Sequence, residues 1–192
     1  MNTKIKNEGF TLIELMITVA LVAILLALSA PYFRETITSN KIGAEANNLM
    51  ASFNLARSTA ARLNQPVTLC KSADGANCTT NGNWEQGWIT FNNLNIDGVV
   101  DTGDGEIVIQ EYTPLPTGYT LRSTPQFSDV VTFLPQGNAR GGSGTLDETS
   151  SFRICATDAS GEEDDAKARQ VFISITGRIR SQKGLDSGID CP

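Results

Sequence analysis

Histidine is absent from the 192-residue chain. Its absence removes histidine-based acid–base catalysis, Ser–His and Cys–His nucleophile pairs, and most zinc sites. The sequence also lacks βαβ alternation and a glycine-rich phosphate loop, so nucleotide chemistry is unsupported. A net charge of −6 argues against a generally basic nucleic-acid binder, but not against a local basic patch. We therefore expect no catalytic residues and no small-molecule substrate. The alternative is an enzyme that is anchored by a helix.

The cysteines contain no CxxC pair, which makes a metal or redox motif a weak interpretation. Their even number fits two disulfides in an exported protein, with three connectivities open. We favour Cys70–Cys78, which closes a short loop, and Cys155–Cys191, which ties the C-terminal tail to the body.

An apolar segment at residues 10–30, "FTLIELMITVALVAILLALSA", carries a single charge, Glu14. As a helix it spans roughly 30 Å, the thickness of a bilayer core. Lys4 and Lys6 precede it and no comparable basic cluster follows at once, so the positive-inside rule keeps the N-terminus cytoplasmic. We expect a transmembrane helix here, with the rest of the chain outside the cytoplasm.

Residues 31–64 continue with a helical pattern after Pro31, where we expect a kink or interruption. One apolar stripe recurs every three or four residues, as in an amphipathic helix. Its members are Ile42, Ala46, Leu49, Phe53, Ala56, Ala60 and Leu63. Packing onto a sheet of the same chain fits these small residues better than a coiled coil, and Gln65-Pro66 ends the helix.

The remainder, residues 65–192, predicts an antiparallel β domain, because short β-rich runs alternate with Gly, Asn, Asp, Pro and Ser clusters. The expected strands are 67–71, 87–93, 106–112, 119–123, 130–135, 151–157 and 169–180. Residues 141–151 and 160–167 are expected to be loops.

The string "KNEGFTLIEL" at residues 6–15 resembles the class III leader of type IV pilins and type II secretion pseudopilins. The resemblance implies that residues 1–9 are a leader, that a prepilin peptidase cuts between Gly9 and Phe10, and that Phe10 is then N-methylated. Glu14 and Pro31 fall at the family's fifth and twenty-second mature positions. The implied fold class is α+β: a pilin fold in which a long N-terminal α-helix packs on a C-terminal antiparallel β-sheet domain.

The resemblance also implies the protein's partners and location. These are other major and minor pilins, and the bacterial inner membrane, with the β domain periplasmic before assembly and extracellular in the fibre afterwards. A carboxylate inside a bilayer is costly and is usually paired, and cleavage creates a positive α-amine on Phe10. We expect Glu14 to pair with the amine of a neighbouring subunit, a heterologous contact that generates an open filament.

The stretch "WEQGWITFNNLNIDGVVDTGDGEIVIQEY" at residues 84–112 resembles the pseudopilin H and FimT/FimU group. Members of that group are minor subunits thought to sit at or near a filament tip and prime assembly. We expect a minor pilin of a type IV pilus, with an H-type minor pseudopilin of a type II secretion system as the alternative. Trp88 and Phe91 are expected to be core residues of a strand.

Residues 166–185 contain five basic residues and no acidic ones. Within them "TGRIR" resembles the Gly-Arg-x-Arg motif by which FimT-type minor pilins are thought to bind double-stranded DNA during natural transformation. Arg178 and Arg180 face the same way if both lie on one strand, and with Lys183 and Arg169 they would contact phosphates without reading sequence. A solvated edge strand with no ligand is the alternative.

Residues 93–104, "NLNIDGVVDTGD", match the register of a calcium-binding EF-hand loop. The matching positions are Asn93, Asn95, Asp97, Gly98, Asp101 and Asp104. The first and last ligands depart from the pattern and strands flank the loop, so a tight hairpin explains the same residues. We expect no cofactor and no metal here, with calcium as the weaker alternative.

Overall fold

The computed structural model describes residues 10–143, 146–147, 149–157 and 168–184, excluding the side chains of residues 29–32 and 34. Its contacts divide the chain into two units, one ending at Ile37 and one beginning at Thr38. A single long helix, α1 (Leu12–Leu63), belongs to both. The interruption expected at Pro31 is wrong, because α1 is helical on both sides of this residue. Proline removes one backbone donor, but it does not force a helix to end.

In the first unit, the apolar side chains from Phe10 to Leu28 are exposed. The predicted transmembrane segment, residues 10–30, falls here. Among the residues that the structure describes, no helix is both long enough and apolar enough to cross a membrane.

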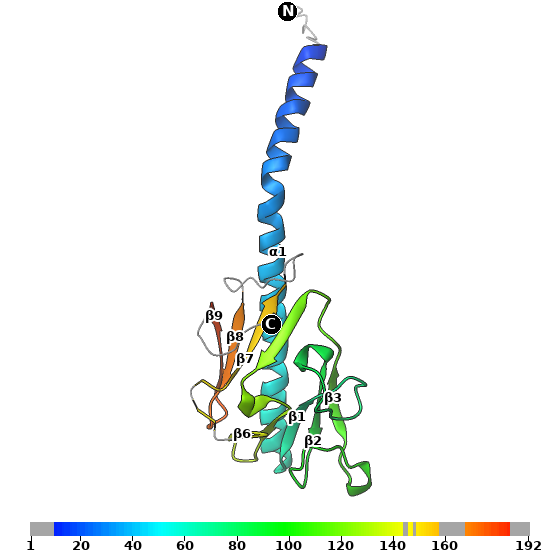
Figure 1. Ribbon diagram of the computed structural model, residues 1–192, viewed down its shortest axis with the longest axis vertical. Coiled ribbons are helices and arrows are strands. Elements are labelled where there is room, and N and C mark those ends of the chain that lie inside the picture. Colours follow the sequence, from blue (N-terminus) through cyan, green and yellow to red (C-terminus); the bar gives the residue numbers. More distant parts are fainter. Residues whose placement is uncertain (1–9, 144–145, 148, 158–167, 185–192) are drawn as a thin grey trace, which may run out of the picture. The chain divides into compact units, whose positions relative to one another are not determined.

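In the second unit, the remainder of α1 packs on the sheets, as the apolar stripe predicts (Figure 1). Six stripe residues are fully buried: Ile42, Ala46, Leu49, Phe53, Ala56 and Ala60. Leu63 is the exception, at 40% exposed, because the helix ends there and Asn64 takes a left-handed conformation with φ of 53°. The prediction that Leu63 belongs to the buried stripe is therefore wrong.

Among the described residues, nine strands form two antiparallel sheets that together bury this helix face. The five-stranded sheet has the order β3-β2-β1-β5-β6, and the four-stranded sheet has the order β4-β7-β8-β9. Their bounds are β1 Val67–Lys71, β2 Trp88–Asn92, β3 Val108–Tyr112, β4 Tyr119–Ser123, β5 Val130–Phe133, β6 Ala139–Gly141, β7 Ser151–Ala156, β8 Arg169–Ile173 and β9 Ile179–Lys183.

The sequence pattern merges two of these strands into one and misses a third. Residues 169–180, expected to be one strand, are a hairpin of β8 and β9 that turns between Ile173 and Ile179. The short strand β6 was not predicted, because its three residues carry too little periodicity to stand out.

The polar side chains between β3 and α1 join the helix to the first sheet. Glu45 is buried on α1 and forms an ion pair with Lys41, with 3.0 Å between Nζ and Oε1. The Tyr112 hydroxyl donates to Glu45 Oε2 at 2.9 Å, and Asn48 donates to both. Trp88 stacks on the Tyr112 ring with centroids 4.1 Å apart and donates to Ser52 Oγ at 3.1 Å.

Burial opposes ionisation of Glu45, but the hydrogen bonds from Lys41, Tyr112 and Asn48 outweigh it and lower the pKa of Glu45. Burial, and then the hydrogen bond to Glu45, raise the pKa of Tyr112 to about 12. The cluster therefore holds an ionised carboxylate against a protonated phenol across neutral pH.

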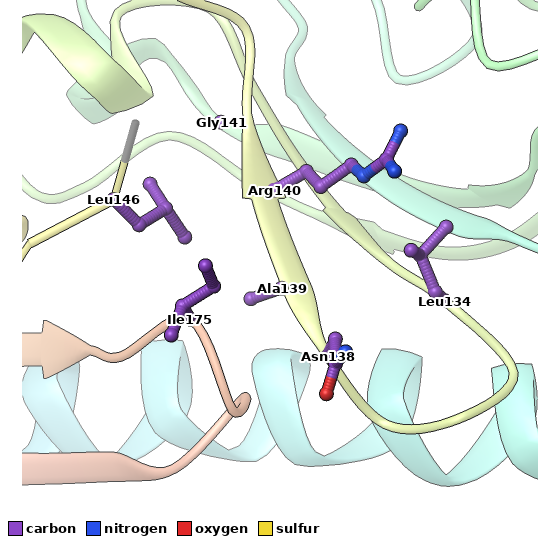
Figure 2. A pocket seen from close by; sticks show the side chains of 7 residues that line it. All are labelled: Leu134, Asn138, Ala139, Arg140, Gly141, Leu146 and Ile175. Carbon is purple, nitrogen blue, oxygen red and sulfur yellow. The ribbon is translucent and has the colours of Figure 1, made fainter. Parts of the chain in front are cut away.

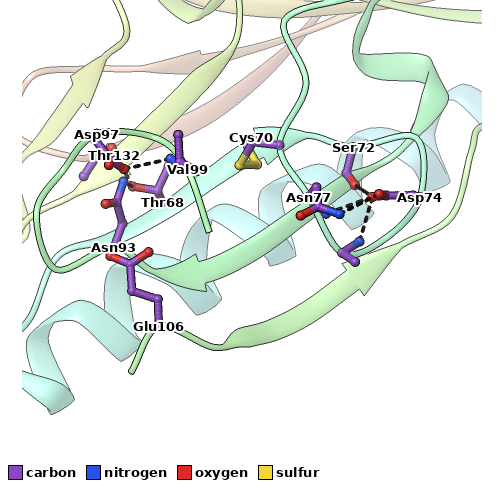
Figure 3. Close-up of a disulfide and its surroundings, with 12 residues drawn as sticks. Thr68, Cys70, Ser72, Asp74, Asn77, Asn93, Asp97, Val99, Glu106 and Thr132 are labelled. Carbon is purple, nitrogen blue, oxygen red and sulfur yellow. Dashed lines mark hydrogen bonds between the residues drawn. A yellow bond between two sulfur atoms is a disulfide. The ribbon is translucent and has the colours of Figure 1, made fainter. Parts of the chain in front are cut away.

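Of the two predicted disulfides, one is confirmed, and the other includes a cysteine outside the described residues. Cys70 and Cys78 form a disulfide that closes the loop after β1 (Figure 3). Cys155 is disulfide-bonded, and its expected partner, Cys191, lies outside the described residues. Trp88 and Phe91 are core residues, as expected, on opposite faces of β2: Trp88 faces α1, and Phe91 packs with Cys70 and Ile89.

Candidate assembly and nucleic-acid interfaces

The turn between β8 and β9 is built by Ser174 and its neighbours. The Ser174 amide donates to the Arg178 carbonyl at 3.1 Å, and the Gly177 amide donates to the Ser174 carbonyl at 2.8 Å. The Ser174 hydroxyl accepts from the Arg178 amide at 3.2 Å and lies 2.9 Å from the Thr176 hydroxyl. These bonds fix the backbone from which the Arg178 side chain projects.

Gly177 allows this turn to approach the turn between β5 and β6. Its φ is +71°, and a Cβ added there would lie 2.0 Å from the Gly137 carbonyl oxygen, so no other residue fits without a shift. Arg57 of α1 bonds both turns, with Nε donating to the Gly137 carbonyl at 3.1 Å and Nη2 to the Thr176 carbonyl at 3.2 Å. The arginine-bearing turn is therefore held by the helix and by the other sheet.

Arg178 and Arg180 line one surface pocket of about 380 Å³. Arg178 lies in the turn, whereas Arg180 lies on β9. The prediction that the two arginines face the same way because they share one strand is therefore wrong. The pocket nevertheless brings the two side chains together with Ser174 and Thr176. Within the described part of the chain, neither arginine forms a salt bridge.

Among the described residues that line this pocket, Asp147 is the one acidic residue. Its carboxylate accepts from the Thr149 hydroxyl at 2.7 Å and the Ser150 hydroxyl at 3.0 Å. These bonds, with those from the backbone, lower the pKa of Asp147. The described residues thus bring two arginines and one ionised carboxylate to this pocket at neutral pH.

The other two predicted DNA contacts lie elsewhere on the hairpin. Arg169 and Lys183 are cross-strand partners at the end of the pair away from the turn. Arg180 and Lys183 are three residues apart on β9, so strand alternation puts their side chains on opposite faces of the sheet. The Arg169 side chain lies against Gly43 of α1. The structure brings together Arg178 and Arg180, and separates them from Arg169 and Lys183.

A second pocket of about 340 Å³ borders β6 beside the same turn (Figure 2). In Figure 2, Leu146 and Ile175 point toward Ala139, whereas Arg140 extends from β6 in another direction. The Ala139 amide donates to the Ile175 carbonyl at 3.0 Å, which links β6 to the turn between β8 and β9. This pocket is therefore lined from the same turn as the basic one, by apolar side chains together with Asn138 and Arg140.

Two positions of the EF-hand register, Asn93 and Asp97, have hydrogen-bond partners within the chain. Asn93 is fully buried, and its amide donates to Thr68 Oγ1 at 3.0 Å (Figure 3). Asp97 accepts from the Val99 amide at 2.8 Å. Among the described residues, no group of three or more Asp, Glu, Cys or His side chains is placed to hold a metal ion.

Glu106, which the sequence analysis did not single out, organises this loop. It is 1% exposed, and its carboxylate accepts from the Leu94 amide at 2.6 Å and the Asp101 amide at 2.9 Å. In the sequence, this residue is visible only as a glutamate two positions after Asp104. That position alone does not tell whether the carboxylate is a buried hydrogen-bond acceptor or an exposed charge.

At the N-terminus, Gly9 lies outside the described residues, and Phe10 is 78% exposed. Thr11 Oγ1 accepts from the Glu14 amide at 3.3 Å, which caps the first turn of α1. The T-x-x-E spacing is that of a capping box, a signal that the sequence analysis missed. The Glu14 carboxylate forms no hydrogen bond or ion pair within the described residues.

A helix whose later half packs under two antiparallel sheets, together with an N-terminal methylation motif, defines the pilin-like class of protein. The prokaryotic N-terminal methylation motif matches residues 4–30. The type II transport protein GspH model matches residues 45–177. The chain belongs to this GspH family, whose members are minor pilins and pseudopilins and not enzymes.

Crystal structures of FimU support the fold. The type IV minor pilin FimU of Pseudomonas aeruginosa is similar in two crystal forms, with TM-scores of 0.50 and 0.52 at 19% and 18% identity. The matches cover 76% and 77% of this chain and 98% and 95% of FimU. The minor pseudopilin EpsH of Vibrio cholerae has a TM-score of 0.44 at 14% identity, over 74% of this chain and 97% of EpsH. No curated protein sequence matches the chain.

Proposed function

We propose that the chain is a minor subunit incorporated at or near the tip of a type IV pilus, where it primes assembly and binds double-stranded DNA non-specifically for uptake in natural transformation. The observation that carries the DNA role is the pocket between β8 and β9. Two arginines without carboxylate partners among the described residues share it with two hydroxyl groups.

Assembly depends on the N-terminal segment in this proposal. A prepilin peptidase cuts between Gly9 and Phe10, and the new amine of Phe10 is methylated and remains cationic. The exposed Glu14 carboxylate of a neighbouring subunit is its partner, because an unpaired carboxylate is costly in an apolar environment. The match of residues 4–30 to the methylation motif supports these roles.

The proposed location follows from the same features. Residues 10–30 anchor the chain in the bacterial inner membrane, and the sheets lie in the periplasm before assembly and on the fibre afterwards. The Cys70–Cys78 disulfide supports an oxidising compartment. Other major and minor pilins are the protein partners.

DNA binding uses phosphate contacts. Guanidinium groups bind phosphate oxygens with charge-assisted hydrogen bonds, and hydroxyl groups such as those of Ser174 and Thr176 are common additional donors. Two such contacts give weak, sequence-independent binding that salt suppresses. Arg178 and Arg180 form the primary contact, and the distant Lys183 is a secondary one.

A minor pseudopilin of a type II secretion system is the second candidate. The name of the matching family, type II transport protein GspH, favours it. This candidate needs the same assembly segment but no DNA contact, so a DNA titration separates the two.

The test is a titration of full-length protein in detergent with a labelled duplex at low salt. The Arg178→Ala/Arg180→Ala variant is expected to lose most of its affinity, and the salt dependence of log K should fall by about 2 units of slope. Arg62→Ala is the matched control, because Arg62 is an exposed arginine in the last turn of α1. Equal binding by the double variant and wild type would refute the DNA role and favour the secretion candidate.

A further inference from the structure

Within the part of the chain that the structure describes, strand β3 (Val108–Tyr112) is the edge strand of the five-stranded sheet. It pairs with β2 on one side only, and Val108 and Gln110 are exposed. Edge strands of soluble proteins are usually protected by lysine, proline or a covering element. Here the neighbouring Ile107 is 63% exposed, and no lysine or arginine occurs between Leu94 and Tyr112.

The loop that leads into β3 adds to this surface. Leu94, Ile96 and Val99 are exposed apolar side chains, and Asp97 and Asp104 are exposed acidic ones. Because the buried Glu106 carboxylate holds two of the loop's amides, the loop has a defined conformation without a partner. We call residues 94–111 the acidic edge; it combines apolar contact area, negative charge and unpaired strand backbone.

Among the described residues, strand β9 (Ile179–Lys183) is the last strand of the four-stranded sheet and pairs with β8 alone, on the opposite side of this unit from β3 in Figure 1. Arg178, Arg180 and Lys183 are exposed, and no acidic residue occurs between residues 166 and 185. The half-buried Ile179 and the exposed Ile175 supply apolar area. We call residues 175–183 the basic edge; its charge, length and backbone complement those of the acidic edge.

We propose that the acidic edge of one copy docks on the basic edge of a second copy of this chain, with β3 and β9 pairing as adjacent strands. Addition of a strand to an exposed sheet edge is a common recognition mode, and complementary charge selects the partner and register. Because the two edges are different surfaces, the contact is heterologous and does not close on itself. Each row of copies leaves one basic edge uncovered at its end.

This inference goes beyond the proposed function, because it assigns a protein partner to a surface that the DNA role does not use, the acidic edge. It also predicts that DNA and a second copy compete for the basic edge. Only the copy at the end of a row would then bind DNA.

Cysteine cross-linking of full-length protein in detergent tests the pairing. Gln110→Cys places a thiol on β3, and Gln182→Cys places one on β9, both at exposed positions. Oxidation of an equal mixture is expected to give several-fold more linked dimer than either variant alone. Gln110→Cys mixed with Ser58→Cys is the control, because Ser58 is exposed on α1 and belongs to neither edge. Cross-linking no stronger than this control overturns the proposal.

Charge exchange gives an independent result. Glu111→Lys combined with Asp104→Lys, or Arg180→Glu alone, should each weaken self-association by roughly 2- to 5-fold, the range for exposed charge pairs. A mixture of the two variants should recover association through reversed charges; no recovery contradicts the pairing. The acidic-edge variant should still bind DNA, so failure here is distinguishable from failure of the DNA role.

Discussion

The guanidinium carbon of Arg180 lies 4.3 Å from the centre of the Phe172 ring, its cross-strand neighbour. This cation–π contact holds the guanidinium against the sheet at the pocket that Arg178 also lines. Phe172 thereby positions an arginine that would otherwise sample many rotamers in water. The arrangement suits an anion contact because less side-chain entropy is lost on binding.

Replacing Phe172 with leucine should therefore weaken DNA binding without removing a charge. We expect a loss of about 2- to 5-fold, equivalent to the 0.5–1 kcal/mol of an exposed cation–π contact. A duplex titration of the Phe172→Leu variant measures it, with the salt dependence unchanged because the number of phosphate contacts is unchanged. A reduced salt slope would show instead that Arg180 no longer reaches the DNA.

Asp147→Asn should have the opposite effect and strengthen DNA binding. The carboxylate lines the same pocket as the two arginines and repels phosphate, whereas an asparagine oxygen preserves an acceptor for Thr149 and Ser150. We expect a gain of about 2- to 5-fold at low salt, typical of one exposed charge. Affinity that stays constant would place the DNA away from this pocket.

Gly177→Ala tests whether the turn positions Arg178. The positive φ and the approach to the Gly137 carbonyl make alanine unfavourable by at least about 1–2 kcal/mol. Denaturant unfolding should show this loss, and DNA binding should fall because the turn shifts. Gly103→Ala is the control, since a Cβ at Gly103 meets no atom within 4 Å and its φ is not positive. Equal stability of the two variants would contradict the close approach of the turns.

The Glu45 cluster predicts how stability depends on pH. Because the folded pKa of Glu45 is lowered from 4.5, its contribution is present above this value and is lost as the pH falls through the folded pKa. Because the pKa of Tyr112 is raised from 10.0 to about 12, its contribution is present below pH 10 and is lost as the pH rises toward 12.

Tyr112→Phe should remove the alkaline loss and shift the acid loss to higher pH, because burial of Glu45 is then less compensated. At pH 7 the variant should lose about 1.5–3 kcal/mol of unfolding free energy, the contribution of one hydrogen bond to a charged group. Denaturant unfolding between pH 3 and 11 measures both limbs. The same pH profile for variant and wild type would show that Tyr112 does not interact with Glu45.

The sequence predicts the elements with strong periodicity. The stripe from Ile42 to Ala60 repeats over five turns, so its burial could be predicted, whereas Leu63 is exposed because the helix ends there. In residues 169–180 the alternation of apolar and polar residues continues through the turn between β8 and β9, and only Thr176-Gly177 indicates that the strand is interrupted.

That break decides which basic residues lie together. Without its position, Arg169, Arg178, Arg180 and Lys183 form one cluster in sequence, whereas register and alternation divide them into two pairs. Arg57 contacts Gly137, which is distant in the sequence, and Glu106 is a buried acceptor for the Leu94 amide. The local sequence pattern carries no information about these two contacts.

The central claim, that this chain is a filament subunit registered by Glu14, is tested most directly by incorporation of Glu14→Gln protein into sheared fibres. This change removes the charge but keeps the side-chain shape. Thr11→Ala is the matched control, because it removes the helix cap and leaves the carboxylate. We predict that Glu14→Gln is absent from fibres, although it is present in membranes, and that Thr11→Ala is incorporated. Incorporation of Glu14→Gln at the wild-type level would contradict the account.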